Sequence, residues 1–152
     1  MKGSLQMLME KITPDYIVGL VDGEGRFTVY VKNPDSDKQV KRRTKVEPRF
    51  FLKLIERDKE ILDELKKYFG VGNVYFQKDT RVNHQNCYRY EVSNREHLEK
   101  VIIPFFKRNT LRLRSKKSDF ETFCTIFEMI RKNLHFTDDG LRRIYALKQT
   151  MH

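Results

Sequence analysis

The feature that most constrains this chain is a pair of glycines four residues apart inside a predicted helix. Thr13 is a suitable N-cap, Pro14 fits the first helical position, and an apolar run follows that reaches the acidic segment Asp22–Gly25. An interior glycine costs about 1 kcal/mol relative to alanine, so Gly19 needs a compensating contact. Because Gly19 and Gly23 share one helical face, they predict close packing against another helix.

Two carboxylates lie at the C-terminal end of this predicted helix. The helix dipole is negative there and disfavours Asp22 and Glu24 unless a cation lies nearby. Mg²⁺ prefers carboxylate, carbonyl and water oxygens, so a bound metal ion would resolve the conflict. Glu24 is therefore the candidate ligand, although an isolated segment of this composition is usually a solvated turn that closes a helix.

The rest of the chain alternates between strand and helix periodicity. The pattern predicts an α+β fold, with the order αββαββα followed by C-terminal helices. We expect one domain over residues 1–152, with its core at about 13–132 and a C-terminal helix at about 137–150. The other expected elements are strands at 26–32, 40–56, 73–79 and 87–93, helices at 58–69 and 118–132, and a helix at 95–106 that Pro104 breaks.

The charge balance favours a polyanionic partner. The chain has 31 Lys and Arg residues against 21 Asp and Glu, a formal net charge of +10, spread along its length. Nucleic acid is such a partner. Many basic proteins bind nothing anionic, however, so charge proposes the partner but supplies no chemistry.

Cysteine usage and hydropathy indicate the compartment. Cys87 and Cys124 are the 2 cysteines, and neither has a neighbour at metal-ligand spacing, so we expect no disulfide framework and no zinc site. There is no secretory leader pattern and no apolar run of spanning length. We therefore expect a soluble intracellular protein without a membrane partner, in the cytoplasm of a prokaryote or the interior of an organelle.

Residues 17–25, with the sequence IVGLVDGEG, resemble the LAGLIDADG motif, and Glu24 occupies the final acidic position. Further matches occur in family order, through DKEILDELKKYFGVGNV, LRLRSKKSDFETF and HFTDDGLRRIYALKQTM, so the resemblance covers nearly the whole chain. The chain is thus similar to LAGLIDADG homing endonucleases. That resemblance implies an αββαββα core with a curved antiparallel sheet that forms a saddle on DNA.

The resemblance also implies how a divalent metal is held. Glu24 would be the catalytic metal ligand and Gly23 would contribute its carbonyl oxygen, whereas Asp22 would support the site without direct ligation. The metal would be Mg²⁺, for which Mn²⁺ substitutes, and the reaction would be hydrolysis of a phosphodiester bond.

Three further residues take implied catalytic roles. Glu56, at the end of the predicted strand FFLKLIE, stands where relatives carry a polar residue that positions the hydrolytic water. Arg114 and Lys116 match a basic site that polarises the active-site water or stabilises developing charge on the phosphate, although both could instead simply bind phosphate. An ungapped match places the family's lysine on Arg114, with Lys116 as a neighbouring contact, and the choice between the two is open.

A single motif occurs in the chain, which implies a homodimer. Two copies would bring two Glu24 residues over the minor groove of a long, near-palindromic duplex and cut both strands, leaving short 3′ overhangs. The expected dimer interface consists of Val18, Gly19, Asp22 and Gly23.

The predicted hairpins present side chains for DNA contact at a period of two residues. Each of these residues alone is as well explained by an exposed strand face, so the set carries more weight than its members. The candidates are Arg26, Thr28, Tyr30, Lys32, Lys41, Arg43 and Lys45 on the first hairpin, and Gln77, Lys78, Arg81, Asn83, His84 and Gln85 on the second.

Two alternative functions fit the same scaffold. An RNA maturase would use the basic surface to bind intron RNA, and a DNA-binding regulator would keep the saddle without hydrolysis. The intact Glu24 argues against lost hydrolysis. A generic basic α+β protein leaves the combination of Gly19, Gly23 and Glu24 unexplained.

Overall fold

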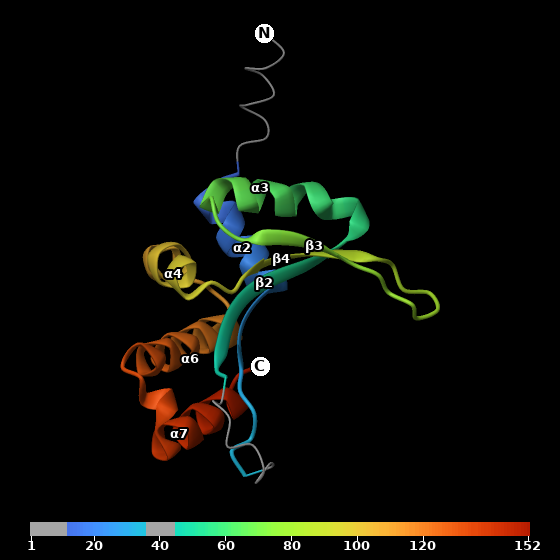
Figure 1. Cartoon of the computed structure of the whole chain (residues 1–152). Helices are drawn as coiled ribbons and strands as arrows, with labels where there is room; N and C mark the ends of the chain where they lie inside the picture. The colour runs from blue at the N-terminus through green and yellow to red at the C-terminus, as the bar shows by residue number, and fades with distance from the viewer. Residues whose placement is uncertain (1–11, 36–44) are drawn as a thin grey trace.

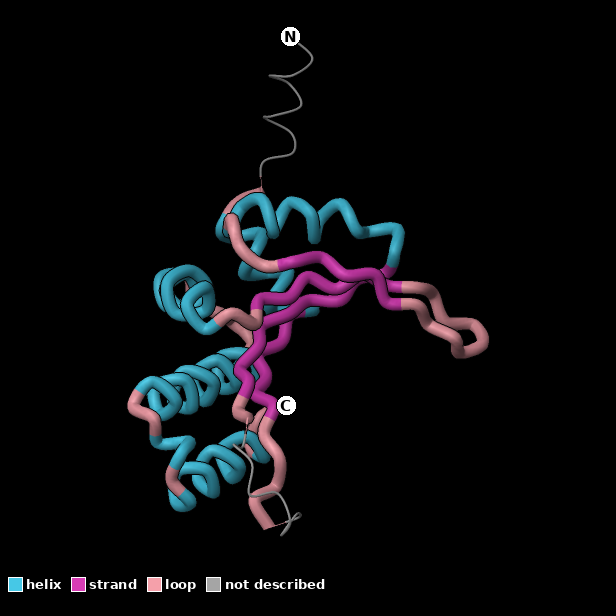
Figure 2. The backbone as a smooth tube through the Cα atoms, in the orientation of Figure 1, coloured by secondary structure: helices cyan, strands magenta, loops and turns pink. Residues whose placement is uncertain are grey.

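A four-stranded antiparallel sheet forms the centre of the molecule. The computed structural model describes residues 12–35 and 45–152. The strand order is β1-β2-β4-β3, so the second strand of each hairpin is central. The sheet bends strongly along its strands, as Figures 1 and 2 show. The strands are β1 Gly25–Tyr30, β2 Glu47–Ile55, β3 Asn73–Gln77 and β4 Cys87–Val92.

The helices cover the convex side of the sheet, and the concave side carries no helix in the part of the chain described (Figure 1). The predicted α+β class and the order αββαββα followed by C-terminal helices are confirmed. None of these helices combines the length and apolar character that crossing a membrane requires. The helical elements of the described residues are α2 Pro14–Glu24, η1 Glu56–Asp58, α3 Lys59–Phe69, α4 Arg95–His97, η2 Leu98–Ile102, α5 Ile103–Arg108, α6 Arg114–Arg131, η3 Leu134–Phe136 and α7 Asp138–Gln149.

An aromatic core joins the sheet to the helices. Phe27 of β1 packs against Phe50 of β2, with ring centroids 4.9 Å apart, and against Phe120 and Phe123 of α6, at 5.0 and 5.3 Å. All four side chains are buried. Such aromatic pairs add to the hydrophobic stabilisation, and they place the first turns of α6 beside β1.

The junction of α2 and β1 depends on one glycine. Gly25 follows the last helical residue directly, and its N–H donates to the carbonyl oxygen of Val21. A Cβ atom at Gly25 would lie 2.6 Å from Cγ1 and 2.9 Å from Cα of Val21, so any larger residue would clash with backbone. The chain can therefore pass from helix to strand without a connecting loop only if glycine stands there.

Two predictions about helix bounds are wrong, and the strands β1 and β3 end two residues earlier than predicted. The helix from Arg95 is not broken at Pro104 but continues to Arg108, because the π turn η2 lets the N–H of Ile103 donate to Leu98 O. That widened turn tolerates Pro104, which has no backbone N–H group to donate. Helix α6 begins at Arg114, four residues before the predicted start, and its lead-in segment is held by contacts described below.

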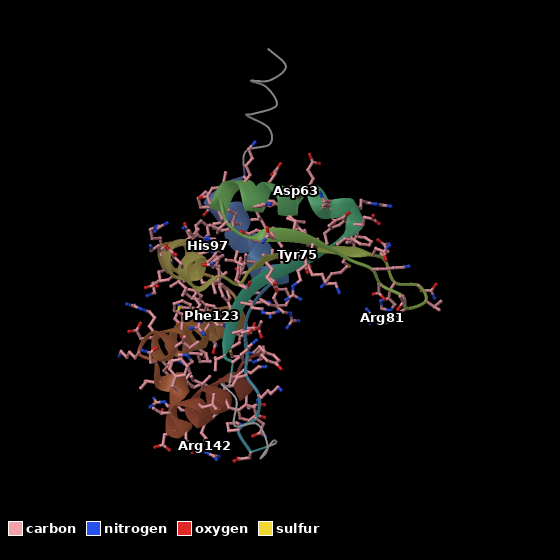
Figure 3. The ribbon with its side chains drawn as sticks, viewed as in Figure 1. Asp63, Tyr75, Arg81, His97, Phe123 and Arg142 are labelled. Atoms are coloured by element: carbon pink, nitrogen blue, oxygen red, sulfur yellow. The ribbon has the colours of Figure 1, made fainter. Side chains whose placement is uncertain are left out.

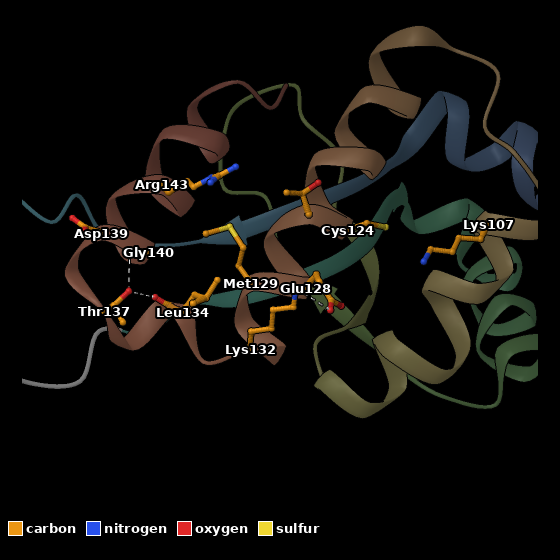
Figure 4. A pocket seen from close by; sticks show the side chains of 11 residues that line it. Lys107, Cys124, Glu128, Met129, Lys132, Leu134, Thr137, Asp139, Gly140 and Arg143 are labelled. Carbon is orange, nitrogen blue, oxygen red and sulfur yellow. Dashed lines mark hydrogen bonds and ion pairs between the residues drawn. The ribbon is translucent and has the colours of Figure 1, made fainter.

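The last helix begins where its cap predicted. Gly140 N–H donates to the Thr137 hydroxyl oxygen at 3.0 Å, and that hydroxyl donates to Leu134 O at 2.8 Å (Figure 4). Ile144 of α7 belongs to the same buried cluster as Ile17 of α2, so the C-terminal helix packs on the common core.

Candidate active site and nucleic-acid interface

The acidic end of α2 divides its two carboxylates between different surroundings. Asp22 is buried, and both of its oxygens accept the N–H of Arg112 at 3.1 Å, while Oδ1 also accepts the N–H of Leu113 at 3.2 Å. These bonds hold the segment that leads into α6 against the end of α2. Glu24, two residues further on, is exposed, and it is the carboxylate that remains open to a ligand.

A lysine from α6 reaches the same junction. Lys116 is partly buried, and its Nζ donates to the backbone carbonyl oxygen of Gly25. The aromatic contacts of Phe120 with Phe27 fix the register of α6 on β1, which brings Lys116 to this place. A cation thus lies at the helix terminus where the dipole favours one.

The charges around Lys116 act in opposite directions on its pKa. Burial lowers the pKa of the Lys116 ammonium group below the usual range of lysine, and the charge of Arg26 adds to that effect. The carboxylates of Asp119, Glu24 and Asp22 oppose it. Lys116 is therefore electrostatically coupled to the candidate metal ligand as well as close to the helix end.

The structure separates the two residues that the sequence left as alternatives. Arg114 is the first residue of α6 and is exposed, whereas Lys116 points to the junction. Residues two apart on a helix point in nearly opposite directions, about 200° around the axis, so both cannot serve one site. The geometry favours Lys116.

Glu56 is exposed and follows the last residue of β2, and its role in positioning the hydrolytic water stays a prediction. Gly25 pairs with Leu52, and Glu56 follows four residues later at the start of η1, which is roughly 13 Å along the strand direction. The side chain beside the junction on the exposed face of β2 is instead Phe51, which pairs with Arg26.

One chain supplies only some of the ligands that a metal ion needs. Glu24 supplies a carboxylate, and Gly23 lies among the last four helical residues, whose carbonyls have no partner within the helix. These oxygen donors suit Mg²⁺, which takes about six oxygen ligands and retains several waters. Among the described residues no three His, Cys, Asp or Glu side chains cluster to form a complete site.

One face of α2 is open. A Cβ atom at Gly19 or Gly23 would meet nothing within 4 Å, so no neighbour in the described chain requires glycine there. A hollow of about 690 Å³ adjoins this face and is lined in part by Asp15 and Gly19. Of the other two predicted interface residues, Val18 is mostly buried in the core, and the Asp22 carboxylate accepts hydrogen bonds from the segment that leads into α6.

The concave face of the sheet carries a row of polar side chains on every strand. Arg26, Thr28 and Tyr30 lie on this face of β1 as predicted by the alternation, because Phe27 and Val29 are buried. The other three strands add residues that the candidate set did not include. They are Glu47, Arg49, Phe51 and Lys53 of β2, Tyr75 of β3, and Arg89 and Glu91 of β4.

The remaining candidates on the first hairpin lie beyond the strand ends. Lys32 and Lys45 are exposed and continue the alternation of β1 and β2. Lys41 and Arg43 lie outside the described residues. Their contribution to the basic surface stays a prediction.

The loop between β3 and β4 uses its charges internally. Arg81 donates to both oxygens of Asp79, at 3.0 and 2.7 Å, and His84 Nδ1 lies 3.6 Å from the same carboxylate. The hydrogen bonds from Arg81 hold the pKa of Asp79 well below its usual range. The loop and the adjoining ends of β3 and β4 form an arm, and Figure 3 shows Arg81 at its far end, beyond Tyr75.

The other candidates of this arm differ in orientation. Gln77 ends β3 on the concave side, and Lys78 follows with opposite parity. Asn83 has a positive φ of 66°, which marks the turn, and Gln85 is exposed. The arm thus offers amide groups with fewer free cations than its sequence suggests.

A second hollow lies on the helical side, away from the motif. It has a volume of about 770 Å³ and lies between α5, α6, η3 and α7, with Lys107, Cys124, Met129 and Arg143 in its lining (Figure 4). Burial raises the pKa of the Cys124 thiol to about 11. Cys124 is therefore a weak nucleophile, and we assign no chemistry to this hollow.

Fold and site together define a class of α+β proteins that place one acidic helix end beside an open, basic sheet. The family model described as LAGLIDADG endonuclease matches residues 17–127. The chain therefore belongs to the LAGLIDADG endonuclease family, as its motif predicted.

The curated relatives are described as probable intron-encoded endonucleases. "Probable intron-encoded endonuclease 2" of Neurospora crassa is 31% identical over 143 residues, which cover 93% of this chain and 29% of the relative. "Probable intron-encoded DNA endonuclease 1" of Mycosarcoma maydis is 31% identical over 110 residues, 72% of this chain and 35% of the relative. The chain thus spans about a third of the length of these relatives.

Solved structures of homing endonucleases share the fold. I-TnaI has a TM-score of 0.76 and 32% identity, covering 93% of this chain and 89% of that chain. The LAGLIDADG homing endonuclease I-SmaMI, solved bound to cleaved DNA, has a TM-score of 0.77 and 29% identity, covering 93% of this chain and 44% of that chain. The predicted LAGLIDADG fold is confirmed.

Proposed function

We propose that this protein is a homing endonuclease that binds a long, near-palindromic double-stranded DNA site as a homodimer and hydrolyses both strands with a divalent metal. The observation that carries the proposal is the α2–β1 junction, where an open Glu24 and a partly buried Lys116 meet at the edge of a concave polar sheet. I-SmaMI and I-CpaMI, two structural neighbours, were solved bound to DNA.

The metal would be held by Glu24 and the Gly23 carbonyl, completed by water and a DNA phosphate. Mg²⁺, with Mn²⁺ as a substitute, supplies activation of water and stabilisation of the leaving oxygen when bound. I-SmaMI was solved on uncleaved DNA in the presence of calcium ions, which supports a divalent metal in general. Lys116 places a positive charge where the phosphate develops negative charge.

The open face of α2 supports the homodimer. Gly19 and Gly23 allow a second helix to approach closely, and nothing in the described chain uses that space. A second copy would bring a second Glu24 to the site and double the length of the saddle. Cutting across the minor groove with two such centres would leave short 3′ overhangs.

A matched pair of variants, each of which removes one negative charge, tests the active site. We expect Glu24→Gln to abolish cleavage of sites selected from a randomised duplex library with Mg²⁺, while DNA affinity stays within a few-fold. Glu60→Gln, an equivalent change at an exposed position of α3, should cut like the wild type. Cutting by Glu24→Gln would contradict the assignment of the metal ligand.

A second pair tests the dimer. Gly19→Leu should give monomers in light scattering, because a bulky side chain would hold the paired helices apart, whereas a Cβ atom at this position meets nothing within 4 Å among the described residues. Ala146→Leu, on an exposed position of α7, should leave the mass of a dimer unchanged. A dimeric Gly19→Leu would place the interface elsewhere.

Two predictions from the sequence concern matters beyond this site. Intron RNA as a partner fits the description of the fungal relatives as intron-encoded, and it stays a prediction. The location in a prokaryotic cytoplasm or an organelle interior also stays a prediction.

A further inference from the structure

The centre of the concave face carries an ionic network that the proposed catalysis does not use. Glu91 of β4 pairs with Phe51 of β2, and Phe51 pairs with Arg26, so these residues form one row across the sheet. Strands lie about 4.8 Å apart, which places Glu91 roughly 10 Å from Arg26, itself two residues after Glu24. The network therefore lies near the cleavage centre.

Glu91 lies between Arg89, on its own strand β4, and Arg49 of the neighbouring strand β2. Its Oε1 accepts from Arg89 Nη2 at 2.8 Å and lies 3.8 Å from Arg49 Nη1. Only 15% of the Glu91 side chain is exposed, so solvent screens these ion pairs less than pairs at the surface. Arg49 is also held by Glu47 at 2.8 Å.

An aromatic ring completes the arrangement. The guanidinium carbon of Arg89 lies 3.5 Å from the centroid of the Phe51 ring, a cation–π contact that fixes the plane of the guanidinium group. The Nε atoms of Arg49 and Arg89 are buried and have no hydrogen-bond partner among the described residues. The side chains of Arg49 and Arg89 are nevertheless 38% and 22% exposed, so a part of each other than Nε remains accessible to a ligand on the concave face.

We infer that Glu91 determines base specificity next to the centre of the DNA site, by positioning Arg49 and Arg89 to recognise guanine. A guanidinium group donates two hydrogen bonds to O6 and N7 of guanine in the major groove. Glu91 and Phe51 restrict the directions in which the two arginines can donate hydrogen bonds. The Glu91 carboxylate also repels DNA phosphates, which disfavours binding where the arginines make no contact with a guanine. The inference rests on the proposed DNA binding, because it names what one part of that surface reads.

The test compares base preferences position by position. We expect Glu91→Gln to lose about tenfold in preference for guanine at one or two positions next to the centre, in a selection of bound duplexes from a randomised library. Binding to unrelated duplex should tighten, and its salt dependence should steepen by about one unit, because one repulsive charge is removed. Arg89→Lys keeps the charge but loses the planar group, so it should relax the same positions with an unchanged salt dependence.

Controls separate this inference from the proposed function. Glu96→Gln removes the same charge from an exposed ion pair with Lys100 on the helical side and should behave like the wild type. Thermal unfolding verifies that each variant is folded. An unchanged preference in Glu91→Gln, or an equal loss at every position, would overturn the inference while wild-type selection still supported DNA binding. A wild-type protein that selects no duplex would overturn both.

Discussion

The α2–β1 junction and the loop between β3 and β4 each contain an aspartate with strong hydrogen bonds, yet the two aspartates have opposite effects. Asp22 accepts from the backbone N–H groups of Arg112 and Leu113, which fixes a segment and leaves nearby side chains free. Asp79 accepts from the backbone N–H of Arg81 as well, but it also accepts from the guanidinium group of Arg81 and so pairs with a cation that a polyanionic partner could otherwise bind. The difference is that Asp22 bonds only backbone N–H groups from a distant segment, whereas Asp79 also pairs with a cationic side chain of its own loop.

Among the changes that test this comparison, the largest effect should come from Lys116, the lysine at the α2–β1 junction. Lys116→Met should reduce single-turnover cleavage about a hundredfold at saturating DNA, because the positive charge beside the phosphate is lost. Lys117→Met, at the next and exposed position, should cut within a few-fold of the wild type. Equal losses in the two variants would mean that the lysines only bind phosphate.

Removing the carboxylate charge that holds the backbone should destabilise the fold. Asp22→Asn should lower the free energy of unfolding by about 2 kcal/mol, because hydrogen bonds to a buried charged group are replaced by weaker ones. Denaturant titration measures this effect, with the exposed Asp15→Asn as the matched control. Full stability of Asp22→Asn would show that the lead-in to α6 docks without Asp22.

The lowered pKa of Lys116 gives a pH dependence to the same site. Burial disfavours the charged form, so the proton is lost at lower pH than from an exposed lysine, and cleavage that needs the charge should decline as the pH rises through that pKa. Lys116→Arg, which stays charged, should lack the alkaline decline even if its rate is lower. Identical profiles at saturating DNA would assign the decline to another group.

The smallest effect should come from the loop. Asp79→Asn should release Arg81 and His84 and tighten binding to unrelated duplex about threefold in a fluorescence titration, because one negative charge is removed and two side chains become free. Asp63→Asn, in an exposed ion pair of α3, is the matched control. Unchanged binding would place the loop away from DNA.

Element types followed from the sequence more reliably than side-chain partners. The N-cap Thr13 and the alternation around Phe27 correctly indicated α2 and β1. The break at Pro104 was wrong, because a π turn is a rearrangement of hydrogen bonds that local pattern does not reveal. The alternation in RFFLKLI did contain the signal for Arg49 and Lys53, since burial of Phe50 and Leu52 places them on the other face.

The residues of the candidate site divide in the same way between those that the sequence indicated and those that only the structure brought together. Local chemistry singled out Glu24 as the acidic end of a glycine-bearing helix, because helix periodicity and dipole act over neighbouring residues. The choice of Lys116 over Arg114 required the packing of α6 on β1, and the network of Glu91 with two arginines required the register of β2 against β4. The sequence by itself therefore determined the family, the order of elements and the acidic motif. Tertiary structure alone decided which distant charges meet, because pairing across strands and helices depends on contacts that no local pattern encodes.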